Sequence, residues 1–264
     1  MGRHRGKYQP GRVEPYELSR SKVEKFIQCP ACFWLDRVKG VHFPSLPGFN
    51  LNTNTDKLLK LDFDRYRGNG PHPVMAHNGL TNLRPYAHDD FEKWETSLHF
   101  ALSPQHFNTV HRETNICFGG GLDDVWQDIN NEVLHIVDYK STAQLGKQPK
   151  PLDQTFLDGP WKEPYKRQME MYQWVMRRKG FNVSDRGYFL YVDGQHLGQV
   201  GMIDNDEPER GYMQFKTSII SYDGNDNWVE DALINIRSLL DTKSCPEHSS
   251  GCEYGVFLDE VLAD

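Results

Sequence analysis

Two aspartates and a lysine near the middle of the chain are residue types that could act together on a phosphodiester bond. Asp123 follows three glycines, and Asp138-Tyr139-Lys140 ends an aliphatic run further along the chain. Carboxylate oxygens bind hard divalent cations such as Mg²⁺ and Mn²⁺. A bound cation offsets charge on a phosphoryl oxygen and acidifies water, and a nearby ammonium group can orient that water. These residues therefore indicate a metal-dependent hydrolytic site.

A β-hairpin is predicted to bring these residues together. Segments 119–128 and 132–140 have the composition of two strands, and the polar pair Asn130-Asn131 between them suits a turn. Successive side chains of a strand point to opposite faces, so Asp138 and Lys140 should share a face. Asp123 on the first strand should then lie beside them.

The cysteines form a second group that could bind metal. Cys29-Pro-Ala-Cys32 lies near one end of the chain, and Cys245 and Cys252 lie near the other with His248 between them. Thiolates suit zinc or an iron–sulfur cluster. We expect the four cysteines to form one site that ties the two ends together, with His248 as a further ligand. Cys117 lies in a predicted strand and is expected to be a core thiol.

Three motifs resemble those of the RecB-type branch of the PD-(D/E)XK nucleases, which includes the AddB-like and CRISPR-adaptation nucleases. The first motif is Gly-Gly-Leu-Asp123 followed by Val-Asp138-Tyr139-Lys140. The second is the run Leu-Ser-Arg-Ser-Lys-Val-Glu-Lys-Phe-Ile-Gln-Cys-Pro that ends at residue 30, and the third is Gln168-x-x-x-Tyr172. Together they cover residues 18–193, and the cysteine-bearing end extends the resemblance to about residue 255.

The resemblance implies an α/β fold with a restriction-endonuclease-like core, in which helices flank a central mixed sheet. It implies that Asp123, Asp138 and the Tyr139 carbonyl bind Mg²⁺ or Mn²⁺. In the same way, Lys140 would serve the attacking water, while Gln168 and Tyr172 would lie beside the active site and the DNA.

Two ligand positions are left with alternatives. Asp124 competes with Asp123, and since neighbours on a strand face opposite ways only one can serve; the family pattern selects Asp123. The family often places a metal-binding histidine on an earlier helix, where this chain has none. Asp56 is the best substitute there, but an acidic residue in a first helical turn also simply suits the helix dipole.

The cysteine pattern departs from the family's arrangement. Several members join their ends with a [4Fe–4S] cluster held by one N-terminal and three C-terminal cysteines, whereas this chain has two at each end. The identity of the metal therefore stays open between iron–sulfur and zinc.

The positions of helices, strands and loops follow from periodicity and from turn residues. A flexible basic arm is predicted over residues 1–17, and one nuclease domain over 18–264 with a cysteine-containing segment at 241–264. Glycines 119–121 indicate a bulge or a close backbone approach. The predicted helices are 21–28, 56–67, 89–100, 163–179 and 228–240; the other predicted strands are 109–118, 186–193 and 212–222; loops are predicted at 40–55, 67–87 and 143–160.

The overall composition fits a polar globular protein. The chain has 264 residues, 38% apolar residues and a mean hydropathy of −0.70. It contains no apolar run of membrane-spanning length and no apolar signal core at its start, so we expect a cytoplasmic protein without a membrane partner. The net charge of −7 is unfavourable for DNA binding, which depends on lysine and arginine. Basic residues nevertheless gather at residues 3–12 and 162–179.

The resemblance, together with the acidic residues and the lysine, predicts a Mg²⁺- or Mn²⁺-dependent deoxyribonuclease. An exonuclease or end-trimming enzyme of DNA repair, recombination or CRISPR adaptation is expected, acting on single-stranded DNA or duplex ends, with a helicase or integrase as a possible partner. One alternative is a DNA-binding or scaffolding module that keeps the fold without cleaving. Another is a zinc-stabilised protein unrelated to nucleic acids.

Overall fold

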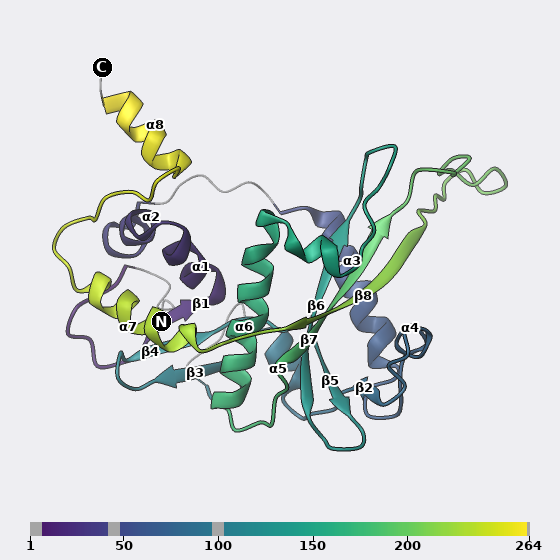
Figure 1. Cartoon of the computed structure of the whole chain (residues 1–264), viewed down its shortest axis with the longest axis horizontal. Coiled ribbons are helices and arrows are strands. Elements are labelled where there is room, and N and C mark those ends of the chain that lie inside the picture. Colours follow the sequence, from purple (N-terminus) through teal and green to yellow (C-terminus); the bar gives the residue numbers. More distant parts are fainter. Residues whose placement is uncertain (1–6, 42–47, 97–102, 263–264) are drawn as a thin grey trace.

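The larger of two β-sheets in the computed structural model has five strands in the order β2-β5-β6-β7-β8 (Figure 1). The structure describes residues 7–41, 48–96 and 103–262. Strands β6 and β7 run parallel, and the other neighbours run antiparallel. The fold is therefore a mixed α/β fold, as predicted. The strands are β2 (Leu83–Pro85), β5 (Asp124–Asp128), β6 (Leu134–Thr142), β7 (Arg186–Gly194) and β8 (Phe215–Asp223).

A smaller sheet packs on the other side of a long central helix. It contains β1 (Tyr16–Ser19), β4 (Ile116–Gly119) and β3 (Asn108–His111), with β1 parallel and β3 antiparallel to β4. The single strand predicted over 109–118 is thus wrong, because the chain reverses between β3 and β4. Asn115 supplies the left-handed backbone of that turn, with φ of 53°.

The segment predicted as a flexible arm contributes to the core where the structure describes it. Tyr8 is buried, its amide donates to the Arg37 carbonyl, and its hydroxyl donates to Asp241. Tyr16 already belongs to β1. The arm prediction is therefore wrong for this part, and residues 1–6 lie outside the described residues.

Helix α6 (Glu163–Arg178) lies between the two sheets (Figure 1) and contacts β6 on one side and β3 and β4 on the other. Its side chains from Gln168 to Met176 are all buried. Helices α1 (Arg20–Gln28) and α7 (Trp228–Leu240) pack against it. In the sequence, α1 is followed by α2 (Pro30–Trp34) and the π-helical turn η1 (Leu35–Lys39).

The opposite face of the large sheet is covered by α3 (Asn50–Asp64) and α4 (Pro73–His77). A second core forms there from Phe63, Met75, Leu83, Trp126, Val137, Tyr139, Tyr188 and Leu190. The remaining helical segments are α5 (Phe91–Glu95), the 3₁₀ turns η3 (Gln154–Asp158) and η4 (Pro160–Lys162), and α8 (Glu253–Leu262). Helix α8 extends away from the body of the molecule (Figure 1).

Several element boundaries differ from the predictions. Helix α3 begins at Asn50, inside the predicted loop 40–55, although its first turns are rich in asparagine and threonine. Burial of Thr55, whose hydroxyl hydrogen-bonds to Ser141 on β6, outweighs that poor propensity. The predicted loop 67–87 contains α4 and β2, and the predicted loop 143–160 contains η3. Helix 89–100 is shorter, as α5, and its positions 97–100 lie outside the described residues.

Other predictions are confirmed. Helix α7 has the predicted bounds, α6 ends one residue early, and strand 186–193 is β7 with one more residue. The predicted strand 212–222 is β8, shifted toward the C-terminus. Helix α1 begins after Ser19 as expected, but the Ser19 side chain makes no capping hydrogen bond to the helix.

Candidate active site and metal centre

The candidate active site lies where β5 and β6 separate. Their last paired residues are Asp124 and Val137. Before that pair the chain turns away, since the Leu122 amide donates to the Trp94 carbonyl at 3.1 Å. Asp123 therefore lies just before β5, whereas the sequence predicted it to lie on that strand. Its Oδ2 accepts a hydrogen bond of 2.9 Å from the Tyr139 amide.

That hydrogen bond fixes the direction of the Tyr139 backbone. The N–H and C=O of a strand residue point to the same side of the strand. The Tyr139 carbonyl consequently points to the edge that β5 has left free, where Asp123 lies. The predicted carbonyl and carboxylate ligands are thus neighbours.

Asp138 and Lys140 face α6, on the sheet surface opposite to Val137 and Tyr139. The Gln168 side-chain amide donates to Asp138 Oδ1 at 2.7 Å, and the Lys140 ammonium forms an ion pair with Oδ2. Asp138 is only 1% exposed. Burial, reinforced by the charge of Asp123, raises the pKa of Asp138 to about 7 against the opposing effect of Lys140. The carboxyl can therefore exchange a proton near neutral pH.

The charge of Lys140 is stabilised in spite of its burial. Desolvation disfavours the ammonium, but Asp138 and Asp123 together raise the pKa of Lys140 above its ordinary value. Its Nζ also lies 4.8 Å from the centre of the Tyr165 ring on α6. Lys140 is accordingly a fixed positive charge beside the two carboxylates.

Tyr172 reaches the same place from the next turn of α6. Burial raises the pKa of Tyr172, while the guanidinium of Arg20, which hydrogen-bonds to the hydroxyl, opposes the rise. A Cβ on Gly120 would lie 2.6 Å from Tyr172 Cε1 and 2.7 Å from its hydroxyl oxygen. Gly120 therefore makes room for the Tyr172 side chain, and the predicted close backbone approach is at Gly119, where a Cβ would lie 2.2 Å from the Phe107 carbonyl oxygen.

Asp124, the competing ligand, is occupied by structural contacts. It is fully buried and accepts hydrogen bonds from Arg67 (2.9 Å), Trp126 Nε1 (3.0 Å), the Tyr139 hydroxyl (2.8 Å) and the Val125 amide (2.9 Å). Asp123 retains 23% side-chain exposure. The structure thus leaves Asp123 as the carboxylate that can accept a further ligand.

Asp56 is connected to Asp123 through a lysine. Lys60 lies one turn after Asp56 on α3, with its Nζ 3.3 Å from Asp56 Oδ2 and 3.9 Å from Asp123 Oδ1. Burial and the charge of Asp123 raise the pKa of Asp56. Glu95 Oε1 lies 3.8 Å from the same ammonium, and burial raises the pKa of Glu95 to about 7. Three carboxylates therefore surround one lysine at this edge.

Sequence reasoning missed Arg20, Lys60 and Glu95. Arg20 lies inside the Leu-Ser-Arg-Ser motif, so that motif carried a signal for it. Lys60 has helical i, i+4 spacing to Asp56, which is a weak signal because such pairs are common on helix surfaces. For Glu95 the sequence holds only helical spacing to its apolar neighbours.

The groups at this edge can be compared with the predicted Mg²⁺ or Mn²⁺ site. Asp138 Oδ2 is buried and accepts no hydrogen bond of good geometry from the described residues, and Asp123 is partly exposed. No three carboxylate side chains bring one oxygen each within 4.8 Å of one another in the described part of the chain. Lys60 and Lys140 lie among the carboxylates instead. Asp123, Asp138 and the Tyr139 carbonyl are the groups that would hold the ion.

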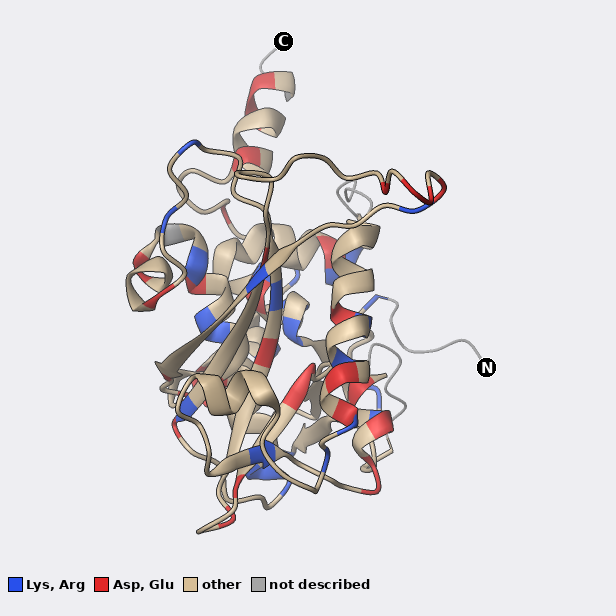
Figure 2. Ribbon diagram, turned by 90° about the vertical axis from the view of Figure 1, so that its right-hand side faces the viewer, with Lys and Arg blue, Asp and Glu red and all other residues tan. Residues whose placement is uncertain are grey.

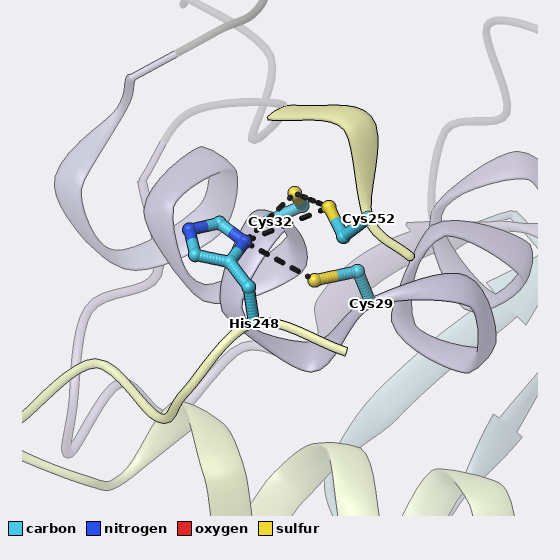
Figure 3. Close-up of side chains that lie close together, drawn as sticks. All are labelled: Cys29, Cys32, His248 and Cys252. Atoms are coloured by element: carbon cyan, nitrogen blue, oxygen red, sulfur yellow. Dashed lines mark hydrogen bonds between the residues drawn. The ribbon is translucent and has the colours of Figure 1, made fainter. Parts of the chain in front are cut away.

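The second centre joins the two ends of the described chain (Figure 3). The side chains of Cys29, Cys32, His248 and Cys252 point toward a common point, and their ligand atoms all lie within 4.8 Å of one another. His248 Nδ1 lies 3.4, 3.6 and 3.6 Å from the three sulfurs in that order, and the Cys32 and Cys252 sulfurs are 3.5 Å apart. The group could hold a metal ion.

These separations match a tetrahedral zinc site. Zinc bonds of about 2.3 Å to sulfur and about 2.0 Å to nitrogen place tetrahedral ligands about 3.8 Å (sulfur–sulfur) and about 3.5 Å (sulfur–nitrogen) apart. Ligands of an iron–sulfur cluster bind different iron atoms and are spread around the cluster. The compact group therefore gives no support to the predicted [4Fe–4S] cluster.

The ligand set differs from the predicted four cysteines. Cys245 is exposed and lies outside the group, and its sulfur is 3.9 Å from the Ala31 carbonyl. His248, predicted as a further ligand, takes the fourth position because its ring reaches the sulfurs from the adjacent loop. Burial opposes ionisation of Cys29, but amides of Cys32 and Ser249 outweigh it and bring the pKa of Cys29 down to about 6. Cys117 is buried in β4 as predicted.

A scan against protein-family models and a search of curated proteins both find no match. None of the helices in the described residues is long and apolar enough to cross a membrane.

Proposed function

We propose that the chain is a metal-dependent deoxyribonuclease with a restriction-endonuclease-like core, which hydrolyses phosphodiester bonds and trims DNA ends. One observation carries the proposal. Asp123, the Tyr139 carbonyl, Asp138 and Lys140 meet at the free edge between β5 and β6, and Gln168 holds the Asp138 carboxylate. Two acidic ligands, a backbone oxygen and a fixed ammonium are a suitable set for this reaction.

A divalent cation, when bound, would supply positive charge to the phosphoryl oxygens and lower the pKa of a water molecule. The chain's own groups would do the rest. Gln168 orients Asp138 by donating to Oδ1, so the other oxygen is directed toward Lys140. The Lys140 ammonium can donate to the attacking water or to a phosphoryl oxygen. Arg20 can donate two hydrogen bonds to a neighbouring phosphate.

The charge distribution agrees with an approach of DNA from the side of the β6–α6 connection. That connection carries the exposed residues Lys147, Lys150, Asp153 and Asp158, and Lys162 follows on η4, so its lysines exceed its carboxylates by one. The β7–β8 loop instead carries Asp204, Asp206, Glu207 and Glu209 at its tip, and Figure 2 shows these acidic residues far out on the loop. Phosphates would be repelled there, so part of the acidic net charge lies away from the site.

A second candidate is a DNA-binding or scaffolding module that does not cleave. The observation in its favour is that the Lys60 and Lys140 ammonium groups already neutralise the carboxylates. A protein that never binds a cation at this edge would need such partners. The two candidates differ in one property, which is cleavage.

Cleavage of end-labelled single-stranded and duplex DNA with Mg²⁺ or Mn²⁺ is the test. The purified wild type should cut, whereas Asp138→Asn and Lys140→Met, which keep the side-chain size, should lose at least about a hundredfold in rate. Lys216→Ala on β8 removes an exposed lysine two strands away and is the matched control. Binding without cutting by a folded wild type would favour the module, and cutting that survives both substitutions would place the activity elsewhere.

A further inference from the structure

Trp161 is an exposed tryptophan on η4, the turn that precedes α6. It is 85% exposed, whereas the five other tryptophans of the chain are buried or partly buried. An indole ring is large and mostly apolar, so its exposure is costly unless a partner covers it. Packing within the described fold does not explain why Trp161 is exposed.

The turn that carries Trp161 is held firmly. Residue 161 is the middle of η4, which the Lys162 amide closes by donating to the Gly159 carbonyl at 2.9 Å. Before the turn, Leu157 is buried. At the last residue of the turn, the Lys162 ammonium lies 4.1 Å from the centre of the Phe156 ring. The tryptophan is thus presented to solvent by a packed segment on both sides.

This turn is connected to the candidate active site through two aromatic rings. The Lys162 ammonium lies 5.2 Å from the centre of the Tyr165 ring, and the Lys140 ammonium lies 4.8 Å from the same ring. Lys162 also lies 5.9 Å from the ring of Tyr191, which is the strand partner of Lys140 in the β6–β7 ladder. Lys140 and Lys162 therefore lie near the same Tyr165 ring, and Trp161 is the residue next to Lys162 in the chain.

The ammonium group of Lys162 is available to bind an anion. Lys162 forms no ion pair with a carboxylate of the described residues, and burial together with the nearby charge of Lys140 lowers the pKa of Lys162. A phosphate between the two ammonium groups would relieve their repulsion. A nucleotide offers such a phosphate together with a flat base that can cover an indole ring.

We infer that Trp161 stacks on an unpaired base of the nucleic acid whose phosphate lies at Lys140 and Lys162. The inference rests on the proposed function for the identity of the ligand, and it deepens it by naming a positioning residue. A base inside a duplex is covered on both faces by its stacked neighbours, whereas an unpaired base can turn a free face to the indole ring. The site would accordingly hold a single-stranded segment or a frayed duplex end.

The test is binding of a fluorescein-labelled single-stranded oligonucleotide, measured by anisotropy without added Mg²⁺ or Mn²⁺, so that nothing is cut and the cysteine centre keeps its metal. Three ligands are compared: the oligonucleotide, a blunt duplex of the same sequence, and a backbone of the same length without bases. Trp161→Ala should bind the oligonucleotide about tenfold more weakly, within the range measured for loss of one stacked base. Trp161→Phe should restore most of the affinity, and the base-free backbone should bind all proteins equally.

Phe257→Ala is the matched control, because Phe257 is an aromatic residue 60% exposed on α8, away from this turn. Equal binding by the wild type and Trp161→Ala would overturn the inference, even if the wild type cuts DNA. Equal losses on the oligonucleotide and the base-free backbone would overturn it too. Trp161-dependent binding by a protein that never cuts would support the inference while refuting the nuclease. A wild type that binds no ligand would refute both.

Discussion

Loss of metal from the Cys29, Cys32, His248 and Cys252 centre should destabilise the whole domain, and the size of the effect follows from chain length. A bound ion would link Cys29 to His248, which are 219 positions apart. Closing a loop of that length in the unfolded chain costs about 5 kcal/mol in the chain-entropy model used for cross-links. The unfolding entropy of a chain of 264 residues converts this to about 9 °C in the unfolding temperature.

The assay is thermal unfolding of the purified protein, together with its zinc content. We expect about one zinc per chain, and a fall of about 9 °C when a strong chelator removes it. Cys252→Ser should unfold at the temperature of the chelated wild type and should not respond to the chelator. Cys245→Ser is the matched control, because Cys245 is an exposed cysteine outside the group, and it should behave as the untreated wild type.

Two results would refute this reasoning. If Cys245→Ser lost zinc and His248→Ala kept it, the ligands would be the four cysteines that the sequence indicated. If the chelator removed zinc without lowering the unfolding temperature, the ion would not restrain the unfolded chain.

Three further substitutions probe the candidate active site. Gly120→Ala should cost about 1–3 kcal/mol by overpacking, since its Cβ would lie 2.6 Å from the Tyr172 ring, and urea unfolding measures the loss. Asp124→Asn should cost about 3 kcal/mol, because it breaks a buried ion pair, and the same unfolding experiment measures it. Asp138 has a pKa of about 7 when folded, so the unfolded chain releases that proton first as pH rises, and stability should fall from about pH 4 to about pH 7. Asp138→Asn should flatten this fall, as unfolding at pH 5 and pH 8 will show.

Each of these predictions has its own control. Gly201→Ala adds a methyl group in open space and should change little, and Gly120→Ala should cost almost nothing in a Tyr172→Ala background if the contact is the cause. Asp123→Asn should leave stability nearly unchanged. Equal losses of stability in Asp123→Asn and Asp124→Asn would contradict the assignment of structural contacts to Asp124 alone. Burial raises the pKa of Glu95 to about 7 as well, so part of the pH slope should remain in Asp138→Asn. A slope that Asp138→Asn leaves intact would show that this carboxyl does not cause it.

The sequence predicted the parts of the fold in which local pattern and tertiary contacts agree. The periodicity of α7 and the apolar run of β7 gave nearly correct bounds. The start of α3 could not be predicted, because its first turns have the composition of a loop and depend on the contact of Thr55 with Ser141. The β3–β4 reversal depends on one left-handed residue, Asn115, within a stretch that alternates like a single strand.

The candidate site shows the same division. Alternation along β6 correctly placed Asp138 and Lys140 on one face. It could not distinguish Asp123 from Asp124, since that depends on where β5 separates from β6 and on the Arg67 that occupies Asp124. Alternation also could not predict that Glu95 and Lys60 lie at the free edge between β5 and β6, because they come close only when α3 and α5 pack on the sheet.

The position of α6 between the two sheets has a consequence for how the site can move. From Gln168 to Met176 every side chain is enclosed, so the helix cannot separate from one sheet without exposing the core of the other. Its amide hydrogens should exchange with solvent only when the whole domain unfolds. Gln168 and Tyr172 therefore keep one arrangement through a reaction cycle, and any adjustment to a substrate must come from the loops around the free edge.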